Sequence, residues 1–204
     1  MLKPISSTLQ GVISFTWPMI IISVIIMVSF RICYLIKSKQ PLVIHKELSM
    51  LIFGIYILCL FQVVTFQDDT SWATNNFIPF KEIMRYNITS RLFFKNVLGN
   101  MIMFLPFGFF VSYYLKSEKL TLPLFLILIA SISIEVVQLS IGRVFDVDDI
   151  ILNILGGLMG YGLYFIFKKI GEHLPSFTKK DWFLNILSIL IFIGLITGLV
   201  FILI

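Results

Sequence analysis

The sequence predicts an all-α protein, a polytopic transmembrane helical bundle of about six spans, and three observations support this fold class. Apolar residues make up 58% of the 204 residues and charged residues only 13%, whereas a soluble domain has about 45–50% and about 25%. The mean hydropathy is +0.99. Several charge-free runs also reach the length of about 20 residues that a helix needs to cross the hydrocarbon core of a bilayer. We expect one membrane domain covering residues 1–204.

The expected spans follow the charge-poor runs in chain order. The first run is too long for a cleavable signal peptide and has no small-residue cleavage site, so we expect it to remain as an N-terminal span. The fourth run contains a single charge, Glu135. The six expected spans cover about residues 12–36, 48–67, 96–115, 120–142, 150–167 and 182–204.

Basic residues predict the orientation of these spans. Ten of the 16 Lys and Arg residues follow the first, third and fifth spans, and six lie on the opposite side. The positive-inside rule places the richer side in the cytoplasm, so both termini are expected outside, with about residues 37–47 and 168–181 cytoplasmic. The net charge of +5 then reflects topology and contacts with anionic lipid headgroups, and no nucleic-acid partner is expected.

A group of polar residues is expected at the outer ends of the fourth and fifth spans. Glu135 lies within the fourth span, and an acid inside a membrane costs a few kcal/mol, so it should face the bundle interior and find a partner. Gln138 shares its helical face. If the fifth helix begins near Asp146, residues at i, i+3 and i+7 from there line one face of it. The residues expected to converge are Glu135, Gln138, Arg143, Asp146, Asp149 and Asn153.

Simpler roles are open for several of these residues. Asp146, Asp148 or Asp149 could cap the fifth helix, because acids near a helix N-terminus oppose its dipole. Arg143 could be an anchor at the membrane surface, but three acids follow it within six residues, so we expect it to pair with a carboxylate. A cap does not explain Glu135, which lies two turns inside the span.

Three other patterns concern the neighbouring segments. Asn96 and Asn100 share one face of the third span, and Asn100 is included in the candidate cluster. Gly156 and Gly160 form a small-xxx-small pair, which favours close helix packing over a phosphate site. Residues 75–80, Asn-Asn-Phe-Ile-Pro-Phe, could dip into the membrane interface, plug the outer end of the bundle, or simply anchor the loop.

The distribution of histidines limits the chemistry that these residues could perform. The chain has two histidines, His45 and His173, both in loops expected in the cytoplasm. Ser-His-Asp catalysis and His-Glu-x-x-His zinc chemistry are therefore disfavoured at the outer cluster. The remaining groups are carboxylates and arginines. No cofactor is expected, although a divalent cation at the carboxylates is an open alternative, because such ions prefer oxygen ligands.

Three segments resemble the VanZ-like family of small bacterial membrane proteins. They are Asn75-Asn-Phe-Ile-Pro-Phe80, Asn96-Val-Leu-Gly-Asn-Met-Ile-Met-Phe-Leu-Pro-Phe-Gly108, and Glu135-x-x-Gln138 followed by Arg143-x-x-Asp146-x-x-Asp149-x-x-x-Asn153-x-x-Gly156. The resemblance covers about residues 48–168, and the first and last spans flank this core. The family is named for a protein that lowers susceptibility to teicoplanin, a lipoglycopeptide with an acyl tail that binds peptidoglycan precursors. The resemblance carries over motif positions but no catalytic mechanism.

Three functions are compatible with these observations. The first is a bacterial cell-membrane protein whose outward-facing polar pocket binds a lipid-linked or acylated ligand and lowers teicoplanin susceptibility. Its expected partners are membrane lipids and a lipid-linked cell-wall precursor or lipoglycopeptide. The second is an intramembrane enzyme acting on a lipid-phosphate or polyprenyl-linked wall precursor. The third is a transporter with Glu135 as a proton or cation site.

Overall fold

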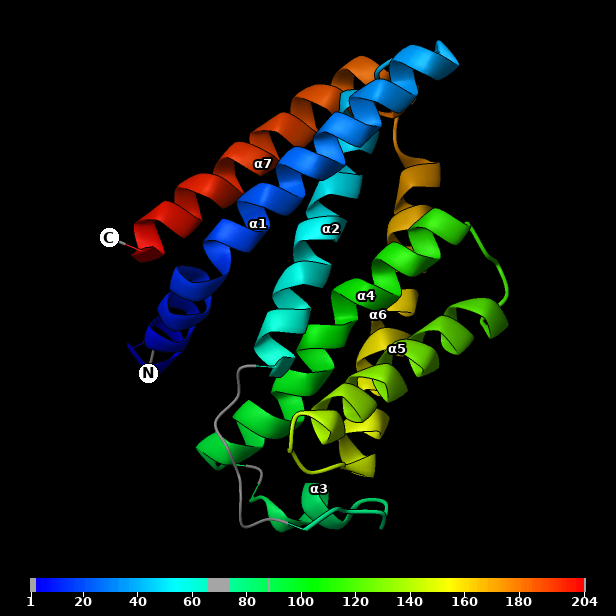
Figure 1. Ribbon diagram of the computed structural model, residues 1–204. Helices are drawn as coiled ribbons and strands as arrows, with labels where there is room; N and C mark the ends of the chain where they lie inside the picture. Colours follow the sequence, from blue (N-terminus) through cyan, green and yellow to red (C-terminus); the bar gives the residue numbers. More distant parts are fainter. Residues whose placement is uncertain (1–2, 66–73, 88, 204) are drawn as a thin grey trace. The chain divides into compact units, whose positions relative to one another are not determined.

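A computed structural model describes the backbone of residues 3–65, 74–87 and 89–203, and the side chains of residues 17–64, 74–87 and 89–198. The described backbone is helical apart from short connections and one isolated bridge, which confirms the all-α fold class (Figure 1). The elements are α1 (Lys3–Ser38), α2 (Ile44–Thr65), α3 (Lys81–Arg85), the π-helix η1 (Phe93–Leu98), α4 (Gly99–Leu115), α5 (Thr121–Ser140), α6 (Val147–His173), the 3₁₀-helix η2 (Ser176–Lys179) and α7 (Asp181–Leu203).

In the described part of the chain, six helical segments are long and apolar enough to cross a membrane, as the sequence predicts. They are Trp17–Ser38, Ile44–Val64, Phe93–Leu115, Thr121–Ser140, Val147–His173 and Asp181–Gly198. The fifth is longer than expected at both ends. Its helix continues past the apolar run through Asp148 and Asp149 at one end and through Lys168 and Lys169 at the other. The two acids accept hydrogen bonds from α3 and α4, whereas lysines at a helix end can reach the membrane surface.

The chain contains two compact units, and the first consists of Met1–Phe66 with Leu174–Ile204. In it α2 packs against α1 and α7. Arg31 on α1 donates two hydrogen bonds to Glu47 on α2, with Nε to Oε2 at 2.7 Å and Nη2 to Oε1 at 2.9 Å. The backbone N–H of His45 donates to the Asn185 side-chain oxygen on α7 at 2.9 Å. Polar contacts therefore link all three helices where their predominantly apolar surfaces meet.

The second unit, Gln67–His173, contains α3, η1, α4, α5 and α6, with α6 packed against both α4 and α5. Close packing of α4 and α6 depends on glycines. A methyl group added to Gly156 would overlap the Met101 carbonyl oxygen, and one added to Gly160 would overlap the Leu105 carbonyl oxygen. The packing role expected for the Gly156–Gly160 pair is therefore confirmed. That residues 1–204 form a single membrane domain stays a prediction.

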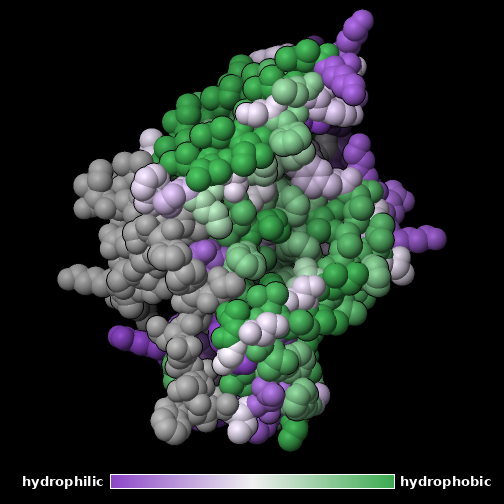
Figure 2. All heavy atoms as spheres, in the orientation of Figure 1, coloured by the Kyte–Doolittle hydropathy of each residue, from purple (hydrophilic) through white to green (hydrophobic). Residues whose placement is uncertain are grey.

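The surface distribution fits a multi-pass membrane protein. On the face drawn in Figure 2, hydrophobic residues cover the sides of the helices, and hydrophilic residues gather mainly toward helix ends and loops. Large apolar side chains such as Ile25, Phe125 and Leu190 are exposed along the spans. Such surfaces are suited to lipid and not to water.

Candidate functional site

A loop from early in the second unit is fastened to the connection between α5 and α6. Asn76 and Asp146 form a parallel bridge, in which the Asn76 N–H donates to Phe145 O at 2.8 Å and the Val147 N–H donates to Asn76 O at 3.0 Å. The rings of Phe77 and Phe145 stack with their centroids 5.4 Å apart. Asn76 is buried while Phe77 is 68% exposed, so the loop is anchored through its asparagine, and its aromatic residues face outward.

Asp146 connects this loop to the first turn of α6. Its Oδ1 accepts hydrogen bonds from Asn76 Nδ2 and from the Asp148 N–H, both at 2.8 Å. A side-chain oxygen that accepts the N–H of the second helical residue is an N-cap, so the capping alternative is correct for Asp146. Because α6 begins at Val147, Asp146 lies just before the helix and not on its face. Desolvation raises the pKa of Asp146, although the Asn76 hydrogen bond opposes this shift.

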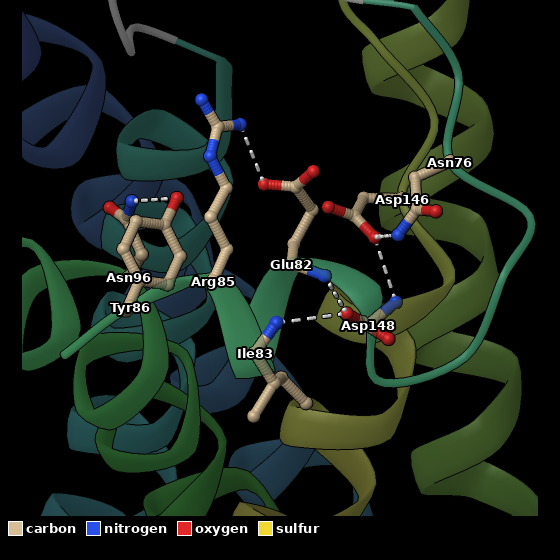
Figure 3. Close-up of polar contacts among 8 residues, drawn as sticks. All are labelled: Asn76, Glu82, Ile83, Arg85, Tyr86, Asn96, Asp146 and Asp148. Atoms are coloured by element: carbon tan, nitrogen blue, oxygen red, sulfur yellow. Dashed lines mark hydrogen bonds and ion pairs between the residues drawn. The ribbon is translucent and has the colours of Figure 1, made fainter. Parts of the chain in front are cut away.

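Asp148 caps a different helix from its own. Its carboxylate accepts the N–H of Phe80, that of Glu82 at 2.7 Å and that of Ile83 at 3.1 Å, so it satisfies the first turn of α3 (Figure 3). Phe80 precedes α3 in the left-handed conformation, with φ of 66°, which costs energy in a residue with a side chain. Asp148 is only 1% exposed, and the three donors compensate for burying its charge.

Glu135 binds the end of the α5–α6 connection from inside α5. It is 1% exposed, and its Oε2 accepts the Asp146 N–H at 2.9 Å. The orientation of the Gln138 amide that satisfies its neighbours places Nε2 3.0 Å from Glu135 Oε1 and Oε1 2.7 Å from Arg143 Nη1. In this arrangement Arg143 donates to Gln138, and Gln138 donates to Glu135. Both Glu135 oxygens therefore bond within the protein, and its carboxylate faces the bundle interior.

Asn100 and Asn153 contact different parts of α5 and α6. Asn100 Nδ2 on α4 donates to Asp149 Oδ1 on α6. Asn153 Nδ2 donates to Ser131 Oγ on α5 at 3.1 Å, one to two turns further into the bundle. Asn100 therefore lies with the candidate cluster, whereas Asn153 belongs to the buried contact between α5 and α6.

A polar pocket of about 280 Å³ lies where α3, η1 and the start of α6 meet. We call it the α3 pocket. Four of the seven expected residues line it, namely Asn100, Arg143, Asp146 and Asp149. Glu135, Gln138 and Asn153 do not line it, although Gln138 contacts Arg143 and Glu135 contacts Asp146. The complete lining is Glu82, Ile83, Tyr86, Leu92, Lys95, Asn96, Val97, Asn100, Arg143, Asp146, Asp148, Asp149 and Leu152.

Polar side chains of the α3 and η1 segments line the side of this pocket away from α6. Asn96 Nδ2 donates to the Tyr86 hydroxyl at 2.8 Å, and Glu82 Oε2 accepts from Arg85 Nη1 at 3.2 Å (Figure 3). Among the residues that the structure describes, no three His, Cys, Asp or Glu side chains form a group suited to hold a metal ion. The four acids that line the pocket instead accept hydrogen bonds from backbone or side-chain N–H groups.

Several pocket residues were not expected from the sequence. Asp148, Glu82, Tyr86 and Lys95 were outside the candidate cluster, and Asn76, which bonds the lining residue Asp146, was only part of a loop motif. Two of the contacts join distant positions: Asp148 with Ile83, 65 residues apart, and Asn76 with Asp146, 70 residues apart. One indication of these contacts is present in the sequence: asparagines and acids recur in the loop that contains Asn76 and in the α5–α6 connection, which the structure joins.

Comparison with known proteins gives the family. A family model described as VanZ/LLP1 matches residues 53–168, which is more than half of the chain and includes every residue of the α3 pocket. The chain belongs to the VanZ/LLP1 family. The assignment confirms the resemblance seen in the sequence motifs.

A curated VanZ/LLP1 relative gives a narrower match. Over 78 residues the chain is 31% identical to Protein VanZ of Enterococcus faecium. These residues make up 37% of this chain and 48% of that protein. The chain thus spans about half the length of the curated relative that it matches. No solved structure matches this VanZ/LLP1 protein.

Proposed function

We propose that this VanZ/LLP1 membrane protein lies in the bacterial cell membrane with the α3 pocket on the outer face, binds a lipid-linked or acylated ligand there, and lowers susceptibility to teicoplanin. The observation that carries the proposal is a polar pocket at the ends of membrane-spanning helices. α5 ends at Ser140, α6 begins at Val147 and the third span begins at Phe93. In a bilayer crossed by these helices, their ends would lie at the depth of the lipid headgroups, which supports the proposal.

The size and lining of the pocket favour a polar headgroup as the bound part of the ligand. Ligand pockets are commonly about 300–1,000 Å³, so a volume of about 280 Å³ suits a headgroup and not a whole glycopeptide. Lys95, Asn96, Arg143 and Asp149 supply donors and acceptors on several sides. Such convergent polar groups fix the orientation of a small ligand.

The rim of the pocket favours an acyl chain on the same ligand. Leu92 lines the pocket and is 57% exposed, and the nearby Met84 and Phe94 are 81% and 54% exposed. A chain leaving the pocket on this side would contact apolar side chains and lipid together. The ligand would therefore be an amphiphile held at the membrane surface.

The other two functions receive less support from the arrangement. Both oxygens of Glu135 accept hydrogen bonds inside the protein, which favours a positioning role over that of an ion carrier. An enzymatic role would use Asp149, which lines the pocket beside Arg143, as an acid or base. Release of product from lipid-phosphate substrates by the purified protein, lost in Asp149→Asn, would favour the enzyme.

Antibiotic susceptibility tests the proposed function. We expect the wild-type protein, expressed in a susceptible bacterium, to raise the inhibitory concentration of teicoplanin at least fourfold, with a smaller effect on a glycopeptide that lacks an acyl chain. Asp149→Asn should lose this protection. Glu118→Gln should keep it, because Glu118 is 80% exposed in its side chain and lies outside the pocket. Equal protection by Asp149→Asn at equal protein levels would contradict the proposal.

A further inference from the structure

We infer that the α3 pocket recognises a headgroup that carries a primary ammonium next to a phosphate, as in phosphatidylethanolamine, with the ammonium held between Asp146 and Asp149. This inference rests on the proposed function, because it names the class of ligand for the same pocket. It follows from which polar atoms of the lining are already bonded within the protein.

Two of the four acids in the lining are engaged elsewhere. The Asp148 carboxylate accepts three N–H groups of the α3 segment, and Glu82 pairs with Arg85 at 3.2 Å. Asp146 and Asp149 differ from them. Oδ1 of Asp146 bonds Asn76 and the Asp148 N–H, and Oδ1 of Asp149 bonds Asn100. The second oxygen of each accepts no hydrogen bond from the part of the chain that is described.

The charges then favour one additional cation. Asp146 and Asp149 share the lining with Arg143, which donates to the Gln138 oxygen, and with Lys95, which lines it from η1. At the start of α6 two carboxylates therefore face one guanidinium, and a carboxylate in a partly desolvated site is costly unless it is paired. A primary ammonium offers three N–H donors to two acceptor oxygens. A metal ion fits less well, because no group of three suitable ligands is present among the described residues.

The position of Lys95 sets the order of the groups along the ligand. Lys95 lines the pocket from η1, is exposed, and forms no ion pair with any described residue. A lysine ammonium on this side suits a phosphate. Leu92, one turn before it, is 57% exposed and begins the apolar rim. Ammonium, phosphate and acyl chain thus follow one another from α6 toward η1 and the membrane.

Binding to three lipids with identical short acyl chains tests this inference on the purified full-length protein in detergent. We expect phosphatidylethanolamine to bind about tenfold more tightly than phosphatidylcholine, a difference of about 1.4 kcal/mol, because the trimethylammonium of phosphatidylcholine has no N–H donors for the two carboxylates. Phosphatidylglycerol, which has no ammonium, should bind more weakly still. Equal or tighter binding of phosphatidylcholine or phosphatidylglycerol would overturn the inference.

Charge-neutral variants test the named groups. Asp149→Asn should remove the preference for phosphatidylethanolamine, and Asp146→Asn should weaken it while keeping the N-cap, because asparagine caps as well as aspartate. Lys95→Gln should weaken binding of all three phospholipids, and Glu118→Gln should change nothing. An unchanged preference in Asp149→Asn protein with a normal melting temperature would contradict the assignment.

Competition and susceptibility separate this inference from the proposed function. Soluble phosphoethanolamine should compete at least tenfold more weakly than the lipid; equal competition would assign the site to a soluble amine and overturn the lipid. If no headgroup preference is found while Asp149→Asn still abolishes teicoplanin protection, the ammonium assignment fails alone. If the preference is found but Asp149→Asn keeps full protection, the proposed function fails and the ammonium site stands.

Discussion

The Arg143 side chain connects the α3 pocket with the buried pair Gln138 and Glu135. It lines the α3 pocket with Asp146 and Asp149, and its Nη1 lies 2.7 Å from Gln138 Oε1, through which it is linked to Glu135. Pairing of Arg143 with one of the acids stays a prediction. The observed donation to Gln138 already gives the guanidinium a structural role.

Arg143→Ala should therefore lower the amount of folded protein as well as any binding. Removing one member of a buried charged group strands the others, at a cost of about 3–5 kcal/mol. Arg143→Lys should recover little of this, because an ammonium cannot reproduce the planar fork of donors. Melting temperature in detergent measures both variants. An Arg143→Ala protein that accumulates and melts normally but loses lipid binding would show a ligand-binding role instead.

Asp146 should make stability depend on pH. Its pKa in the folded protein is raised by burial, so the folded state holds its proton more tightly than the unfolded state does. The free energy of unfolding should then fall as pH rises above about 4, the ordinary range of an aspartate. Asp146→Asn should reduce this fall, measured as melting temperature between pH 4 and 7. A steeper fall in the variant would contradict the assignment.

The sequence indicated some of these residue roles and missed others. Glu135 was expected inside the bundle because an acid in lipid is costly, and its carboxylate does bond Asp146 and Gln138. Asp148 was not assigned to the cluster, because its partners Glu82 and Ile83 lie 66 and 65 residues away. A contact of that range follows from how two loops dock, and helical periodicity gives no information about it.

At the scale of elements, the packing of α4 against α6 depends on two glycines. Gly156→Ala or Gly160→Ala would place a methyl group on the backbone of α4, so we expect either to cost about 1–3 kcal/mol. Gly162→Ala on the same helix is the matched control, since nothing lies within 4 Å of its added methyl group. It should leave stability unchanged or raise it slightly. Thermal unfolding of the three variants tests this, and equal melting temperatures would contradict it.

The approximate positions of the helices could be predicted where the length of a charge-free apolar run determines them. All six spans were found, because a charge-free run of about 20 residues has few alternatives. The short helix α3 and the π-helical start of the third span were not anticipated. α3 has five residues and depends on Asp148 for its cap, so it is stabilised by tertiary contacts and not by its own sequence.

At the scale of the whole molecule, both termini are expected on one side of the membrane if all six candidate spans among the described residues cross it. The excess of basic residues in the other loops predicts that this side is the outside. Reporter fusions after Lys39 and at the C-terminus should give cytoplasmic and outside activity, respectively. A cytoplasmic C-terminus would require one fewer span or a reversed bundle. A reversed bundle would place the α3 pocket on the cytoplasmic face, where an extracellular antibiotic does not reach it.

The central claim is that the α3 pocket holds the headgroup of a membrane amphiphile. An experimental structure of the full-length protein, determined in bilayers that contain phosphatidylethanolamine, tests it most directly. We expect density for a headgroup between Asp146, Asp149 and Lys95, continuing as an acyl chain over Leu92 and Phe94. A pocket that holds only a metal ion bound by Asp146 and Asp149, or that is filled by the protein's own side chains, would contradict the claim.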